Sequence, residues 1–160
     1  MAKKHVRRIL NCLPSTGQER DWRLDDAREA GALAAAKIPE EKDLRQRWWA
    51  IGDQGETGSC VGWAAADSVL RWHMVQAGKL DPDEALSVRF VWMAAKEPDE
   101  FVTRPTTFIE SDGTSLKAAL DIARKYGAVA DAVLPFGSGA LFPGRAETFY
   151  ALASRLRIAG

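Results

Sequence analysis

Residues 53–60 read Asp-Gln-Gly-Glu-Thr-Gly-Ser-Cys, and an apolar stretch begins at Val61. This stretch predicts a helix over residues 59–77, because its apolar residues recur at helical spacing and Gly78 suits a helix end. Cys60 would then lie at the helix N-terminus, where unpaired backbone N–H groups and the helix dipole favour a thiolate. A cysteine beside apolar residues is more often an inert buried thiol, so both interpretations stay open.

Gln54 lies six residues before Cys60. A side-chain amide there can donate an N–H beside the sulfur, as the oxyanion hole of an acyl-transfer enzyme requires. Gly55 and Gly58 allow a tight turn between the two side chains. The sequence therefore predicts Cys60 as the nucleophile and Gln54 as the oxyanion-hole donor. Gly58 is a candidate substrate-binding residue.

The pattern Gln-Gly-x-x-Gly-Ser-Cys at 54–60 resembles the active-site segment of papain-like cysteine peptidases. In that family the glutamine belongs to the oxyanion hole and the last cysteine is the nucleophile. Residues 38–45 are similar to the start of the mature enzymes, and residues 113–136 to a later turn, helix and closing Pro-Tyr. The resemblance implies a mostly α fold, the helical (left) lobe of a papain-like α+β fold, with Gly113 as a further candidate for substrate binding.

The chain departs from the family at Val61, which replaces an aromatic residue after the cysteine, and in two further ways. Thr57 stands where the family has a half-cystine, so the usual disulfide of this loop cannot form. The family's catalytic histidine and asparagine lie about 130–150 residues beyond the cysteine, outside these 160 residues. His73 lies about 20 Å from Cys60 along a continuous helix, too far for a hydrogen bond, and His5 lies among basic residues.

Three functions remain open on these residues. The first is a cysteine-type peptidase that forms a thioester on Cys60, acts on a peptide or protein, and needs a second lobe or chain with the catalytic histidine and asparagine. The second is a non-catalytic papain-like pseudo-peptidase or binding domain. The third is another thiol acyl transferase that uses the same cysteine.

Composition narrows the function classes. Lysine plus arginine equals aspartate plus glutamate, 22 each, which argues against a nucleic-acid surface. No apolar run reaches the length of about 18 residues that a membrane helix needs, and no signal peptide is expected. Two cysteines without a disulfide framework fit a reducing, cytoplasmic location. The histidines and cysteines lack metal-ligand spacing, so we expect neither metal nor cofactor.

We expect an N-terminal arm or short extension over 1–37, helical in part from residue 21, and the papain-like lobe over 38–160. Trp48, Trp49 and Ile51 are expected to anchor the approach to the lobe. The apolar face of the first helix is expected to include Val61, Ala65, Val69 and Trp72. Further elements are expected as helices over 87–96, 114–126 and 146–154, and as the opening of a strand over 156–159.

Overall fold

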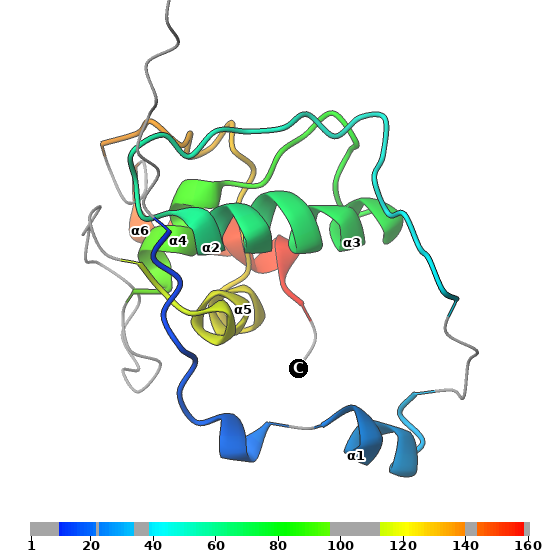
Figure 1. Cartoon of the computed structure of the whole chain (residues 1–160). Helices are drawn as coiled ribbons and strands as arrows, with labels where there is room; N and C mark the ends of the chain where they lie inside the picture. Colours follow the sequence, from blue (N-terminus) through cyan, green and yellow to red (C-terminus); the bar gives the residue numbers. More distant parts are fainter. Residues whose placement is uncertain (1–9, 22, 34–38, 97–112, 140–143, 159–160) are drawn as a thin grey trace, which may run out of the picture.

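The computed structural model describes residues 10–21, 23–33, 39–96, 113–139 and 144–158. Its helices are η1 (Gln18–Arg20), α1 (Leu24–Glu29), α2 (Cys60–Gly62), η2 (Trp63–Leu70), α3 (Arg71–Gln76), α4 (Val88–Ala94), α5 (Leu116–Lys125), α6 (Ala146–Ala153) and η3 (Ser154–Leu156) (Figure 1). In the described ranges, β-structure is confined to two isolated bridges, Cys12 with Thr114 and Leu86 with Ala130. The predicted mostly α fold is confirmed.

One unbroken helix, made of α2, η2 and α3, crosses the molecule from Cys60 to Gln76 (Figure 1). Ser59 precedes it as the N-cap residue. It ends where Gly78 takes a left-handed φ of 65°, and the N–H groups of Gly78 and Lys79 donate to the carbonyls of Val75 and Met74. The predicted bounds of this helix are therefore correct to within about a residue, the ordinary uncertainty of a helix end.

The middle of this helix, η2, is a π-helix, whose wider turns shift the buried face. A helix with 3.6 residues per turn would bury Val69. The structure instead leaves Val69 51% exposed and buries Leu70 at 2% exposure. Met74 follows Leu70 on the buried side. The prediction that Val69 faces the core is wrong because it assumed regular α-helical turns, and no sequence signal predicted the π turns.

The core lies between the central helix and α4, and α5 and α6 complete it. Every residue of α4 is buried, and its N-cap Ser87 accepts a hydrogen bond from the N–H of Phe90 at 3.1 Å. The central helix approaches α4 closely at Gly62, where an added Cβ would lie 2.7 Å from the Cβ of Trp92. From α6, Phe149 packs edge-on against Phe90, with ring centroids 5.4 Å apart.

Two other predicted features differ in the structure. The expected strand is wrong for its described residues, because Leu156 ends η3 and Ile158 makes a single backbone hydrogen bond, to the carbonyl of Ala123, at 3.3 Å. Ile51 is not a core anchor, since its side chain is fully exposed, whereas Trp48 and Trp49 are half-buried. The prediction that the arm is helical in part from residue 21 is confirmed by α1 in the described part of the arm.

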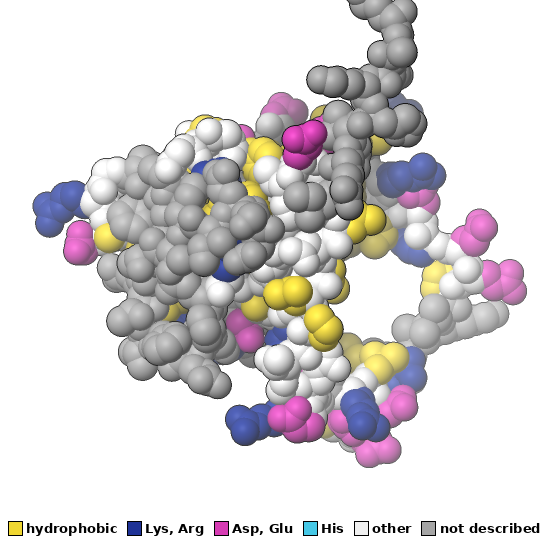
Figure 2. All heavy atoms as spheres, turned by 60° about the vertical axis from the view of Figure 1, so that its left-hand side comes forward, with side chains coloured by type: hydrophobic (Ala, Val, Ile, Leu, Met, Phe, Trp, Pro, Cys, Tyr) yellow, Lys and Arg dark blue, Asp and Glu magenta, His cyan; other side chains and the backbone are white. Residues whose placement is uncertain are grey.

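The N-terminal arm is attached to the body along α5. The N–H of Leu13 donates to the carbonyl of Thr114 at 3.0 Å, beside the parallel bridge of Cys12. Lys117 then binds the arm twice, through its N–H to the Ser15 hydroxyl at 3.3 Å and through its ammonium group to Asp21. Below this attachment, charged side chains of both signs surround η1 and α1 in the lowest part of Figure 2.

Candidate active site

Cys60 is the first residue of the central helix, as the sequence predicted, and its side chain is half-buried. Val61 and Gly62 behind it are buried, and Ser59 in front of it is completely buried. Cys60 therefore packs against the core and is itself only partly buried. A reactive thiol requires this partial access, which a sealed core cysteine lacks.

Gln54 opens a tight turn that ends at Thr57. The Thr57 N–H donates to the Gln54 carbonyl at 3.3 Å, and the Gln54 side-chain nitrogen donates to the Thr57 carbonyl at 3.0 Å. Gly55, the first central residue, has φ of 58°, the conformation that a type II′ turn requires at that position. The amide of Gln54 is therefore held by its own turn.

The turn is joined to the helix that carries Cys60. The Thr57 hydroxyl donates to the Gln54 carbonyl at 2.7 Å and lies 2.7 Å from the hydroxyl of Ser59. Gly58, the predicted substrate-binding residue, is buried between them. Gln54 and Cys60 thus lie at the two ends of one hydrogen-bonded segment, and their predicted catalytic roles stay predictions.

A groove of about 510 Å³ borders Gln54 on the side of the approach loop. Its lining comes from residues 45–46, 49–52 and 54 of the loop and residues 63–64 and 67–68 of the central helix. At its floor, Asp67 accepts hydrogen bonds from the guanidinium of Arg71, at 2.9 Å, and from the indole of Trp49. Burial raises the pKa of Asp67, and the bonds from Arg71 and Trp49 oppose that rise.

Arg71 joins the approach loop to the central helix through a second contact, with Trp48. Its guanidinium carbon lies 5.0 Å from the centroid of the Trp48 ring, and the group also donates to the carbonyl of Pro82 at 3.1 Å. Arg71 is 6% exposed, so this is an ion pair out of water. The loop that leads to Gln54 is thus held on the central helix by a buried charge pair and two indole rings.

Gly113, the second predicted substrate-binding residue, is buried beneath the arm. A Cβ at this position would lie 1.6 Å from the carbonyl oxygen of Asn11. A cavity of about 540 Å³ extends from there, between the arm, the end of α4 and the start of α5. In the structure, Gly113 therefore contacts the N-terminal arm at Asn11. Its role in substrate binding stays a prediction.

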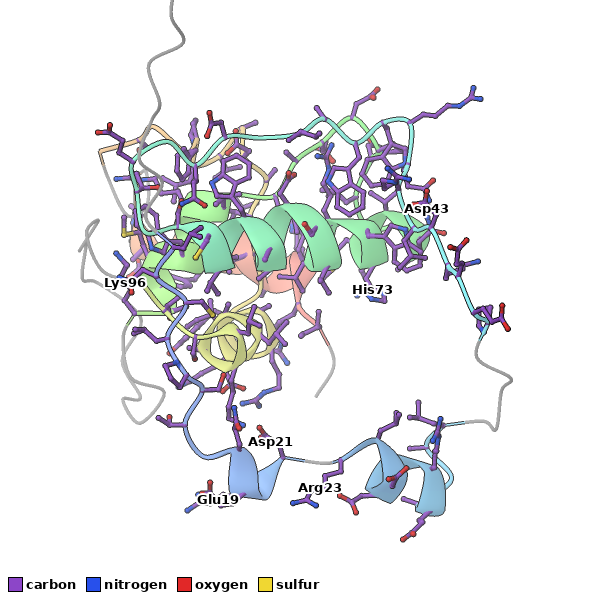
Figure 3. The ribbon with its side chains drawn as sticks, in the orientation of Figure 1. Glu19, Asp21, Arg23, Asp43, His73 and Lys96 are labelled. Carbon is purple, nitrogen blue, oxygen red and sulfur yellow. The ribbon has the colours of Figure 1, made fainter. Side chains whose placement is uncertain are left out.

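His73 lies on α3, at the opposite end of the central helix from Cys60 (Figure 3). It is exposed, and its ring stands edge-on to Trp72 at 4.9 Å between centroids. Because the helix between the two residues is unbroken, His73 does not serve Cys60 as a base.

No cluster of three or more metal-ligating side chains occurs among the residues that the structure describes. In the same residues, no helix combines the length and the apolar character that crossing a bilayer requires.

Sequence reasoning missed two parts of the site. The sequence indicates only that Thr57 replaces a half-cystine, whereas the structure shows that its hydroxyl forms hydrogen bonds. Asp67 and Arg71 are spaced four residues apart, which is a signal for an ion pair on a helix. Nothing in that spacing indicated that the pair would be buried under Trp48 and Trp49.

No protein-family model and no curated protein matches this sequence. Among solved structures, the chain is similar to xylellain, a cysteine protease from Xylella fastidiosa, with a TM-score of 0.69 and 18% sequence identity. The similarity covers 100% of this chain and 60% of the xylellain chain. The chain therefore shares its fold with part of a cysteine protease.

Proposed function

We propose that this chain carries the nucleophile and the oxyanion hole of a cysteine-type peptidase. The observation that carries the proposal is the half-buried Cys60 at the start of the central helix, joined to Gln54 through one hydrogen-bonded turn. The resemblance of residues 54–60 to the papain-like segment and the fold shared with a cysteine protease support it.

In the proposed reaction, the Cys60 thiolate attacks the carbonyl carbon of a peptide bond and forms a C–S bond. The electron pair of the carbonyl moves to its oxygen, which accepts hydrogen bonds from the Gln54 side chain and the Cys60 backbone N–H. Collapse of this intermediate breaks the C–N bond and leaves a thioester, which water hydrolyses. A histidine from a second lobe or chain takes the thiol proton and returns it to the leaving amine.

The pseudo-peptidase alternative predicts an inert thiol at Cys60, whereas the peptidase proposal predicts a reactive thiolate. Both cysteines are free, Cys12 is exposed and Cys60 is half-buried. Exposure alone therefore favours alkylation of Cys12, whereas an activated thiolate favours alkylation of Cys60.

The test is the rate of alkylation by iodoacetamide near pH 6.5, measured with the histidine-bearing lobe or chain present and followed by peptide mass spectrometry. We expect Cys60 to react at least about tenfold faster than Cys12, since the thiolate is the nucleophile. Cys12→Ser should leave the fast reaction in place, Cys60→Ser should abolish it, and His73→Ala should leave it unchanged. Faster reaction of Cys12 would favour the inert thiol of a pseudo-peptidase.

A further inference from the structure

Thr57 forms hydrogen bonds with both the backbone carbonyl and the side-chain amide of Gln54. Two hydrogen bonds from Thr57, one from its N–H and one from its hydroxyl, converge on the Gln54 backbone carbonyl, at 3.3 and 2.7 Å. The Gln54 side-chain nitrogen returns a bond to the Thr57 carbonyl at 3.0 Å. Three hydrogen bonds between two residues fix the backbone of Gln54 and the plane of its amide together.

The same hydroxyl reaches the residue before the nucleophile. Thr57 Oγ1 lies 2.7 Å from Ser59 Oγ, and Ser59 is 0% exposed and directly precedes Cys60. A hydroxyl is both donor and acceptor, so Thr57 can bond Gln54 and Ser59 at once. Valine, which has the same shape but no hydroxyl, cannot make either contact.

We propose that Thr57 is the positioning residue of the oxyanion hole, setting the Gln54 amide relative to Cys60 through its hydroxyl. The inference rests on the proposed function of Cys60 and Gln54. In the papain-like segment a half-cystine occupies this place, so the chain uses hydrogen bonds where that segment has a covalent link.

Two reagents separate positioning of the amide from reactivity of the thiol. Iodoacetamide is attacked at its methylene carbon, the C–S bond forms as iodide leaves, and no charge develops on the carbonyl oxygen. A peptide aldehyde is attacked at its carbonyl carbon, the C–S bond forms as the carbonyl π bond breaks, and its oxygen becomes an oxyanion that later takes a proton. The Gln54 amide stabilises only the aldehyde adduct.

The experiment measures both reactions, with the histidine-bearing lobe or chain present, for the wild type, Thr57→Val and Thr57→Ser. We expect Thr57→Val to weaken binding of the aldehyde up to about 100-fold, the effect of misplacing a catalytic group by about 1 Å, with the iodoacetamide rate within about twofold of wild type. Thr57→Ser keeps the hydroxyl and should recover most of the binding. Thr148→Val, on the exposed side of α6, is the matched control and should change neither reaction.

The outcomes are distinct. Equal aldehyde binding by Thr57→Val and wild type would overturn the positioning role, as would a parallel loss in both reactions. A wild-type Cys60 that reacts with neither reagent would instead overturn the proposed function itself, and the positioning role with it.

A second measurement on the unmodified protein applies even where Thr57→Val does not fold. The Gln54 side-chain N–H proton that is bonded to the Thr57 carbonyl should exchange slowly with solvent, as measured by nuclear magnetic resonance. Fast exchange of that proton would contradict the proposal.

Discussion

Neutralising Asp67 should destabilise this chain, although the residue is not part of the proposed chemistry. The Asp67 and Arg71 side chains are 12% and 7% exposed, and their charged atoms lie 2.9 Å apart. Asp67→Asn keeps the shape of the side chain and removes its charge, so the guanidinium of Arg71 remains buried without a counter-charge.

The cost follows from this burial. Breaking a buried ion pair by removing one partner typically destabilises a protein by about 3–5 kcal/mol, whereas an exposed pair contributes at most about 1 kcal/mol. We expect the lower end of this range for Asp67→Asn, because burial raises the pKa of Asp67 even beside Arg71, so removing the buried negative charge offsets part of the loss. Replacing both residues, as Asp67→Leu with Arg71→Met, should recover most of the loss, since apolar residues of similar volume tolerate this burial.

Urea unfolding followed by tryptophan fluorescence measures these losses, and the two single variants Asp67→Leu and Arg71→Met complete a double-mutant cycle. We expect a coupling energy of at least about 2 kcal/mol between the two positions. Arg71→Met should also lose more stability at pH 7 than at pH 4. The reason is that an Asp67 without its cation is more stable protonated, so the penalty develops as the pH rises through its raised folded pKa. Losses that simply add, with coupling below about 0.5 kcal/mol, would refute the argument.

Two further changes test neighbouring parts of the structure. Burial raises the pKa of Asp131 above its usual value of 3.8, so ionisation of this side chain opposes folding as the pH rises through the folded pKa. Asp131→Asn should therefore be more stable than the wild type at pH 7 and equally stable below pH 3.8. Equal stability of the two proteins at both pH values would contradict this prediction. Gly113→Ala should displace the arm, since its Cβ would lie 1.6 Å from the Asn11 carbonyl oxygen. Hydrogen exchange of the Leu13 amide, which is bonded to Thr114, should therefore accelerate. Gly139→Ala is the control, because its Cβ would meet open space, and it should leave the Leu13 amide protected.

The helices could be predicted from sequence because their ends carry local signals. Ser87 and Ser115 each cap a helix by accepting a hydrogen bond from an N–H three residues later, and such residues are recognisable before an apolar run. Gly78 ends the central helix in a left-handed conformation that suits glycine. In each case the information lies within a few residues of the feature.

Other features depend on contacts between distant segments. The arm is attached through Leu13 and Lys117, which are separated by about a hundred residues and have no shared local pattern. The π turns of η2 shift burial from Val69 to Leu70, and apolar periodicity assumes regular turns. Ile51 looked like an anchor because it is apolar, but a single exposed apolar side chain is common on protein surfaces.

The candidate site combines both kinds of information. Cys60 and Gln54 could be proposed for this site from sequence, because the chemistry of a nucleophile and an oxyanion donor limits the choice of side chains. Their catalytic roles stay predictions. Their relative position was not readable, because it depends on the Thr57 hydroxyl at one end of the loop and on the Asp67–Arg71 pair at the other. A catalytic arrangement tolerates errors of only about half an ångström, so these supporting contacts matter as much as the reacting groups. It follows that a substitution at Asp67, whose carboxylate accepts a hydrogen bond from Trp49, should displace the loop that leads to Gln54.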